Sequence, residues 1–323
     1  MDKITKIIGI DISKDVFDVV DSNDHHARYK NTVKGFRSFL KSITLDAICV
    51  MEATGYYHMQ LAYYLIEHNI KVAIVNPLSV KRFIQMKLSK IKTDKSDAKM
   101  IRMYGQLNEL TLWNGNSKNQ IASLQIARLL DNYTKQSTAL KNKIHGEITL
   151  GKPAPEVLRS LKRSLKFIEK EKKLLEKKLE TLVKEEHAAM LTNLVSIPGI
   201  GRKTASLLIV YTDAFSRFET AAALCSYCGI TPIIRQSGSS VNSRPRISKM
   251  GNQKLRNLLF LCSFTACIHN KACRDIYQRI TNKGKSKKLA LIAVSNKLLK
   301  QAFAIAKSGV PYDKDYRSVL PIH

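Results

Sequence analysis

Four acidic side chains in the first hundred residues have the types and spacing of a metal-dependent site for phosphoryl transfer. Asp11 and Glu52 each follow a run of four apolar residues. A carboxylate at the end of a buried strand points into the crevice where open α/β sheets bind ligands. Asp94 and Asp97 are three residues apart, so a helix would place them on one face and aim both at those strand ends.

Converging carboxylates repel one another unless cations neutralise them. Their hard oxygen atoms select Mg²⁺, with Mn²⁺ as the alternative ion. Two such ions a few ångströms apart can clamp the attacking and leaving oxygens of a phosphoryl transfer. The sequence therefore predicts a Mg²⁺ site built from Asp11, Glu52, Asp94 and Asp97.

Each acid also has a simpler interpretation. Asp94 and Asp97 suit the first turn of a helix with Thr93 as its N-cap, where the helix dipole favours negative charge. Asp11 suits a turn that opens a hairpin to residues 16–20. Only the joint pattern, two strand-end acids plus a helical pair, favours the catalytic interpretation.

The elements that would position these acids lie within residues 1–112, the first predicted domain. Early hairpins followed by βαβ crossovers are typical of a mixed sheet with helices on both faces, an order compatible with an α/β ribonuclease-H-like fold. We expect strands at 6–11, 16–20, 27–32, 46–51 and 71–75, and helices at 34–43, 57–69 and 94–108.

Residues 113–190 form a second, helical segment with a heptad repeat. The pattern fits a helix packed in its own domain, an antiparallel hairpin or an intermolecular coiled coil, and we expect this segment to mediate dimerisation. Lys172 occupies the one skipped position of an apolar seam that otherwise consists of Leu158, Leu161, Leu165, Ile168, Leu175, Leu179 and Leu182.

Residues 191–323 form a third, mainly α domain that begins with a glycine-containing loop. Gly199 and Gly201 lie in an apolar turn that leads into a helix, as in a helix-hairpin-helix loop. Such a loop presents backbone N–H groups to a phosphate, and the adjoining Arg202 and Lys203 add positive charge. A plain turn between helices explains the glycines, but not the basic pair. We expect contact with a DNA backbone here.

Ser237 is the best placed nucleophile in the basic loop that follows. Basic side chains close to a hydroxyl would hold a phosphate and stabilise its developing charge. The loop has no histidine to act as a base, and a flexible solvated loop is the simpler interpretation. Residues 229–310 hold 16 Lys+Arg and one acid, and the loop's candidate nucleic-acid contacts are Arg235, Arg244, Arg246 and Lys249.

Composition points to a polyanionic partner. The 323-residue chain has 54 Lys+Arg against 26 Asp+Glu, a formal net charge of +28. No apolar run approaches the roughly 18 residues that span a bilayer, and the amino terminus lacks a signal-peptide core, so we expect a cytoplasmic protein. The six scattered cysteines favour reduced thiols over disulfides, and Cys225 with Cys228 lacks the second pair of a zinc site.

Taken together, the motifs resemble those of the DEDD transposases of the insertion-sequence one-ten family, bridge-RNA-guided recombinases of bacterial insertion sequences. Those proteins have a RuvC-like ribonuclease H domain with an Asp-Glu-Asp-Asp set and a carboxy-terminal transposase domain. The likeness covers essentially the whole chain. Its matching segments are 8–11, 52–55, 92–98, 197–201, 237–240 and 247–249.

The resemblance implies that Ser237 attacks a DNA phosphate to form a phosphoserine link while the four acids hold Mg²⁺ beside the scissile strand. Strand exchange would pass through a Holliday junction. A structured non-coding bridge RNA would pair with target and donor DNA. Dimers would assemble into a tetramer in which the serine of one subunit completes the acidic site of another. The protein would act in the bacterial cytoplasm, at the nucleoid.

Two rival functions fit the same residues. A RuvC-like Holliday-junction or ribonuclease-H-type hydrolase would use water as nucleophile, without a covalent intermediate, and Ser237 would only bind phosphate. A non-enzymatic nucleic-acid chaperone would bind tightly in a salt-sensitive way and would have no chemical step to lose.

Overall fold

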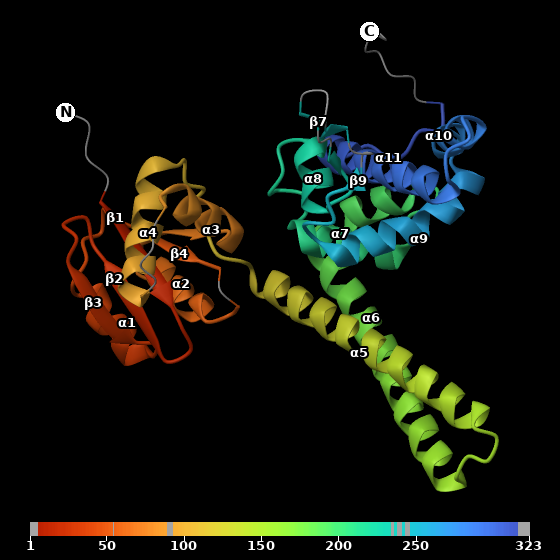
Figure 1. Ribbon diagram of the computed structural model, residues 1–323, viewed down its shortest axis with the longest axis horizontal. Helices are drawn as coiled ribbons and strands as arrows, with labels where there is room; N and C mark the ends of the chain where they lie inside the picture. The colour runs from red at the N-terminus through yellow and green to blue at the C-terminus, as the bar shows by residue number, and fades with distance from the viewer. Residues whose placement is uncertain are drawn as a thin grey trace. The chain divides into compact units, whose positions relative to one another are not determined.

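The protein folds into two compact units, Met1–Asn116 and Ser117–His323 (Figure 1). The structure, a computed structural model, describes residues 6–53, 55–88, 93–233, 236–237, 241–242 and 246–315. The two segments that the sequence analysis separated at residue 190 share the second unit.

The first unit is built on a mixed five-stranded sheet with the order β3–β2–β1–β4–β5. The first three strands in sequence are antiparallel neighbours, whereas β4 runs parallel to both β1 and β5. All five predicted strands are confirmed, with bounds shifted by at most two residues: β1 Ile7–Ile12, β2 Val16–Val20, β3 His26–Lys30, β4 Ile48–Glu52 and β5 Lys71–Val75.

Helices cover both faces of this sheet. One face packs against α1 (Val33–Leu40) and α2 (His58–Glu67), and the other against α3 (Pro77–Met86) and α4 (Asp94–Leu107). The sequence analysis missed α3. The sequence signal for α3 is Asn76 followed by Pro77. Asn76 is the N-cap and Pro77 is the first helical residue, an order that favours helix initiation.

The two-residue period of the strands decides which side chains face α4. Ile8 and Ile10 of β1 lie in the core under α1 and α2, so Gly9 and Asp11 lie on the opposite face. In β4 the buried Val50 belongs to the core on the α4 side, and Glu52 shares its face. The strands thus present both strand-end acids to the same helix.

Backbone contact at Gly9 fixes where α4 lies on the sheet. A Cβ atom at Gly9 would stand 2.2 Å from the Ala98 carbonyl oxygen and 2.4 Å from the Arg102 nitrogen. At the other end of the helix, Gly105 approaches the side chains of Val50 and Ile7. The helix therefore runs antiparallel to β1, and its first turn lies toward the Asp11 end of that strand.

The second unit begins with an antiparallel hairpin of α5 (Lys118–Thr149) and α6 (Pro155–Val195). An ion pair joins Lys141 to Glu169, and a hydrogen bond joins Ser117 to Glu186, so the two helices run in opposite directions. The turn contains Gly151 at φ 86°. The predicted heptad seam packs within this hairpin, with Ile168, Leu179 and Leu182 buried and Leu158, Leu161, Leu165 and Leu175 half-buried.

The remaining helices pack around one hydrophobic core, which also includes residues from the first half of α5 and the second half of α6. Of the helices in the described residues, only α11 is long and apolar enough to cross a membrane. Its Val294, Leu298 and Ala302 are fully buried in this core, as in a core helix. The helices are α7 Arg202–Thr212, α8 Ala221–Tyr227, α9 Gln253–His269, α10 Lys271–Asn282 and α11 Lys287–Ser308.

The six cysteines are free thiols, as predicted. Cys225 and Cys228 are both buried, and burial raises the pKa of the Cys228 thiol to about 12. These side chains act as small apolar groups in the core.

We predict that Gly9→Ala destabilises the first unit by about 2 kcal/mol or more, because the new methyl group overlaps backbone atoms of α4. The only tryptophan, Trp113, packs edge to face on Tyr63 and against the core of this unit, so its fluorescence during urea unfolding reports the transition. Gly146→Ala, a site on α5 with open space around the added Cβ, should leave this transition unchanged. A Gly9→Ala protein as stable as the wild type would contradict the close seating of α4.

Candidate functional site

Asp11 and Glu52 lie at the same edge of the sheet, on neighbouring parallel strands. The register pairs Ile10 with Met51, so the residues that follow them are also neighbours. Asp11 lies inside β1, in register with a residue of β2, rather than in the turn that the simpler interpretation placed it in. Both carboxyl groups are partly buried on the α4 face.

The first turn of α4 carries the other two acids. Thr93 is the N-cap, and its side chain accepts a hydrogen bond from the Ser96 amide while the Ser96 hydroxyl accepts one from the Thr93 amide. This capping box fixes the start of the helix at Asp94, with Asp97 one turn further on. The capping interpretation is therefore correct, and it places the two acids where the helix meets the Asp11 end of β1.

The electrostatics of Asp11 reveal how close the acids are. Its pKa is raised to about 6, chiefly because burial removes water from the carboxyl group. Negative charge on nearby acids raises it further, in the decreasing order Asp97, Asp94, Glu52 and Asp18. All four predicted acids therefore belong to one crowded cluster of negative charge.

This cluster fits a divalent cation in charge and in ligand type. Carboxylate oxygens are the ligands that Mg²⁺ and Mn²⁺ prefer, and a cation would relieve the mutual repulsion. In the part of the chain that the structure describes, no group of three or more His, Cys, Asp or Glu side chains is arranged so that it could hold a metal ion. The four acids therefore lie in one region, but in this structure their carboxyl groups are not arranged around a single ion.

Three further polar side chains lie on the same face, on β2 and β3: Asp18, His26 and Arg28. Asp18, only 2% exposed, is paired with Asp11 in the β1–β2 register. The His26 Nε2 atom lies 2.6 Å from Asp18 Oδ1, and Arg28 Nε donates to both Asp18 oxygens at 3.0 and 3.1 Å. Arg28 Nη2 also donates to Asp94 Oδ2 at 2.7 Å.

The sequence analysis did not single out these three residues. The available signal is Asp18 itself, a charged residue at the centre of an otherwise apolar strand. Lys, Glu, Arg and Asp are almost never fully buried without a partner, so such a position predicts a paired charge. The partners on β3 follow once the strand register is known.

The loop predicted to carry the nucleophile is described only in part. The backbone of Ser237 lies in the short strand β7, where it pairs with Val241, but its side chain lies outside the described residues. Arg235 and Arg244 also lie outside them. Four two-residue strands are described here: β6 Pro232–Ile233, β7 Gln236–Ser237, β8 Val241–Asn242 and β9 Arg246–Ile247.

Two predicted basic contacts of this loop are described. Arg246 is exposed on β9, beside the strand partner Ile233. Lys249 is exposed at φ 55°, and its amide donates to the Gly229 carbonyl. Both side chains therefore face solvent, where a polyanion can reach them.

The two glycines of the predicted helix-hairpin-helix loop serve different purposes. Gly199 has φ 107°, and a Cβ there would lie 2.8 Å from the Ala266 Cβ on α9, so packing and backbone conformation both require glycine. Gly201 is the N-cap of α7 and has open space around it. The start of α7 is therefore open to solvent, as a phosphate contact needs.

The basic pair at the start of α7 already has protein partners. Arg202 Nη1 donates to Glu180 Oε1 at 3.0 Å, and Lys203 Nζ donates to Glu176 Oε1. Both glutamates lie on α6. More than half of the Arg202 and Lys203 side chains remains exposed, so these are surface ion pairs of low strength.

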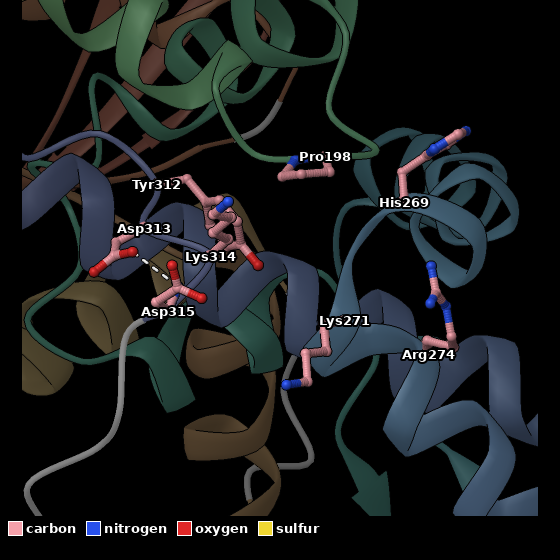
Figure 2. A pocket seen from close by; sticks show the side chains of 8 residues that line it. All are labelled: Pro198, His269, Lys271, Arg274, Tyr312, Asp313, Lys314 and Asp315. Atoms are coloured by element: carbon pink, nitrogen blue, oxygen red, sulfur yellow. Dashed lines mark hydrogen bonds between the residues drawn. The ribbon is translucent and has the colours of Figure 1, made fainter.

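The C-terminal unit also contains a cavity of about 600 Å³, which no predicted site residue lines (Figure 2). Buried Asn270 holds its walls together, because its amide nitrogen donates to Pro198 O and its amide oxygen accepts from the Tyr312 hydroxyl. Its lining carries both signs of charge: Pro198, His269, Lys271, Arg274, Tyr312, Asp313, Lys314 and Asp315.

Comparison with known proteins gives the family. A family model described as "Transposase IS116/IS110/IS902 family" matches residues 191–278, and the DEDD transposase model of the IS110 group, described as "Transposase", matches residues 8–152. The pilin gene-inverting protein of Moraxella bovis is 30% identical over 320 residues, which cover 95% of this chain and 97% of the relative. The chain belongs to the IS110 family of transposases.

A second relative agrees with this assignment. The transposase for insertion sequence element IS1111A of Coxiella burnetii is 25% identical over 338 residues, 96% of this chain and 88% of the relative. The DEDD model covers all four acids of this transposase, and the other model covers its glycine loop and Ser237. The enzyme therefore acts on DNA.

We predict that Asp11→Asn stabilises the metal-free transposase at pH 7.5. The folded chain holds the Asp11 proton more tightly than the unfolded chain, so raising the pH from about 4 to about 6 lowers the free energy of unfolding. The variant escapes this loss, which is about 1 kcal/mol after allowance for partial solvent exposure. Urea unfolding in EDTA is followed by Trp113 fluorescence. The free energy of unfolding of Asp11→Asn should exceed that of the wild type at pH 7.5, and the difference should vanish near pH 4.

Asp24→Asn is the matched control with the opposite sign. The pKa of Asp24 is lowered, first by the hydrogen bond from Lys99 and then by the charge of Arg102. This variant should lose stability at pH 7.5, and its deficit should shrink as the pH falls. Equal stability of Asp11→Asn and wild type at pH 7.5 would contradict the crowding of the acids.

Proposed function

We propose that this transposase is a metal-dependent DNA recombinase that cuts and rejoins DNA through a covalent phosphoserine intermediate. The observation that carries the proposal is the convergence of acids at one edge of the sheet: Asp11 and Glu52 on neighbouring strands, with Asp94 and Asp97 in the first turn of the helix above them. The name of the Moraxella relative refers to inversion of a pilin gene, and we propose that this chain also rearranges DNA.

The first unit is proposed to have a RuvC-like, ribonuclease-H-like fold. Its strand order, its three antiparallel strands followed by two parallel ones, and its match to the DEDD transposase model support this assignment. Open α/β sheets bind ligands at the carboxyl ends of their parallel strands, and Asp11 and Glu52 lie at those ends of β1 and β4.

The four acids are proposed to bind Mg²⁺, with Mn²⁺ as the alternative ion. When bound, such ions neutralise charge on the scissile phosphate and stabilise the attacking and departing oxygens. The protein supplies carboxylates on rigid elements, two on strands and two on a capped helix. Rigid placement reduces the reorganisation required at the moment of reaction.

Ser237 is proposed as the nucleophile. Its Oγ would form a bond to phosphorus while the bond from phosphorus to a deoxyribose oxygen breaks. The proton that the Ser237 hydroxyl gives up would be taken up by the departing oxygen, so the step is balanced. The proposal rests on the match of its segment to the family motif and on the basic side chains Arg246 and Lys249, which are exposed nearby in the chain. Candidate backbone contacts at Gly199, Gly201, Arg202 and Lys203 would hold the DNA.

Guidance by a structured bridge RNA and assembly of dimers into a tetramer complete the proposal. The formal charge of +28 suits a protein that handles both RNA and DNA, since positive side chains neutralise phosphates and favour binding to nucleic acids. The α5–α6 hairpin is proposed as the surface through which protomers pair. A serine supplied by one protomer would then act with the acids of another.

We predict that wild-type protein forms a covalent complex with DNA and that Ser237→Ala does not. Full-length protein loaded with the element's non-coding RNA is incubated with Mg²⁺ and labelled element-junction DNA and resolved on a denaturing gel. Asp11→Asn should also abolish the adduct, because the acids are needed for the chemical step. Ser239→Ala is the control and should retain the adduct.

Cleavage without any adduct would favour the hydrolase alternative, in which water attacks and Ser237 only binds phosphate. DNA and RNA binding with no cleavage, unchanged by Asp11→Asn, would favour the chaperone alternative. An adduct retained by Ser237→Ala would assign the nucleophile to another residue.

A further inference from the structure

We propose that Arg28 is a positioning residue for the acidic site: its guanidinium group, held by buried Asp18, orients the Asp94 carboxylate for a divalent cation. This inference rests on the proposed function, because it assumes that the four acids bind a metal ion. It adds two residues, Arg28 and Asp18, to the set on which that site depends.

The first observation is the forked contact of Arg28. Its Nε donates to both oxygens of Asp18, at 3.0 and 3.1 Å, while Nη2 donates to Asp94 Oδ2 at 2.7 Å. One planar group therefore links β2, β3 and the first turn of α4. A lysine at this position could not reproduce the fork, because an ammonium group is a point charge without fixed planar geometry.

The second observation is the burial of the Asp18 side chain, which is 3% exposed. A buried carboxylate needs partners, and Asp18 has two, His26 Nε2 at 2.6 Å and Arg28. Arg28 is thus anchored at one end by a buried charge that it cannot leave without a large cost. The Arg28 side chain is itself 53% exposed, and its hydrogen bonds to the buried carboxylate restrict the orientation of the guanidinium group.

The third observation is the contrasting exposure of Asp94. Its side chain is 62% exposed and belongs to the first residue of α4, where packing does not fix the rotamer. Within the described residues, the bond from Arg28 is made to Oδ2 and no hydrogen bond to Oδ1 is found, so we take Oδ1 as the oxygen that meets the cation. Hydrogen bonds of this kind orient metal ligands, and their loss typically weakens metal binding 10- to 100-fold.

The positive charge of Arg28, considered without its hydrogen bonds, predicts the opposite effect on metal affinity. If Arg28 acted only as a positive charge beside the acids, it would repel a cation, and its removal would tighten metal binding. The fork predicts that removal weakens binding. The sign of the change in metal affinity therefore separates positioning from simple charge.

The test measures Mn²⁺ affinity of the full-length protein without nucleic acid, from the electron paramagnetic resonance signal of free Mn²⁺. Arg28→Gln and Arg28→Lys should each raise the Kd about 10-fold or more. Arg37→Gln, which removes one exposed charge from α1 on the other face of the sheet, should bind Mn²⁺ like the wild type.

In Arg28→Gln the buried Asp18 carboxylate keeps only its contact with His26, which can destabilise the fold. A second variant is therefore needed to separate an effect on folding from an effect on Mn²⁺ binding. The double variant Asp18→Asn/Arg28→Gln removes that charge together with the fork. It should keep a Trp113 unfolding transition closer to that of the wild type and should show the same weakened Mn²⁺ binding. In the covalent-adduct assay, excess Mg²⁺ should restore much of the adduct that the double variant loses.

Mn²⁺ binding by Arg28→Gln that is as tight as, or tighter than, wild type would overturn the positioning role. So would a variant that loses folded protein while its Kd stays unchanged. A wild type that binds Mn²⁺ no better than Asp11→Asn would instead refute the proposed metal site, and the inference with it.

Discussion

The contact between the α4 backbone and Gly9 is the constraint on which the site depends. It lets a helix lie directly on the central strand of the sheet, with no side chain between them. Moving two residues along a strand and four to five residues along a helix both cover about 6.6 Å. The step from Gly9 to Asp11 therefore matches the step from the contact at Ala98 and Arg102 back to the first turn of α4, so the strand-end acids meet the helical pair.

Electrostatics then set the state of this site. The pKa of Asp11 is raised first because its carboxyl group is buried, and then because backbone packing holds the other acids near it. Arg28 offsets part of the repulsion through Asp94 and Asp18. The C-terminal unit follows a similar pattern, because Arg202 and Lys203 are paired with glutamates of α6. A phosphate bound at the start of α7 would replace these glutamates, whereas Arg28 is proposed to keep its bond to Asp94 when a cation binds.

Much of the first unit could be predicted from the sequence because its signals are local. Continuous apolar runs define β1 and β4, and the acid that follows each run can be seen in the same pattern. Thr93 and Ser96 form the predicted helix start. The missing pieces depend on distant residues: the pairing of Asp18 with Arg28 requires the strand register, and the seating of α4 requires the closeness of Gly9 to Arg102. Likewise, the heptad seam predicted a packed helix but not whether its partner is α5 or a second chain.

The most direct test of the central claim is a crystal structure of the protein soaked in Mn²⁺, with anomalous diffraction recorded at the manganese edge. The account predicts an anomalous peak bonded to Asp11 and to carboxylates of Glu52, Asp94 or Asp97, with Arg28 still in contact with the Asp94 oxygen that faces it. A crystal in which Mn²⁺ binds elsewhere while these four carboxylates hold no ion would contradict it.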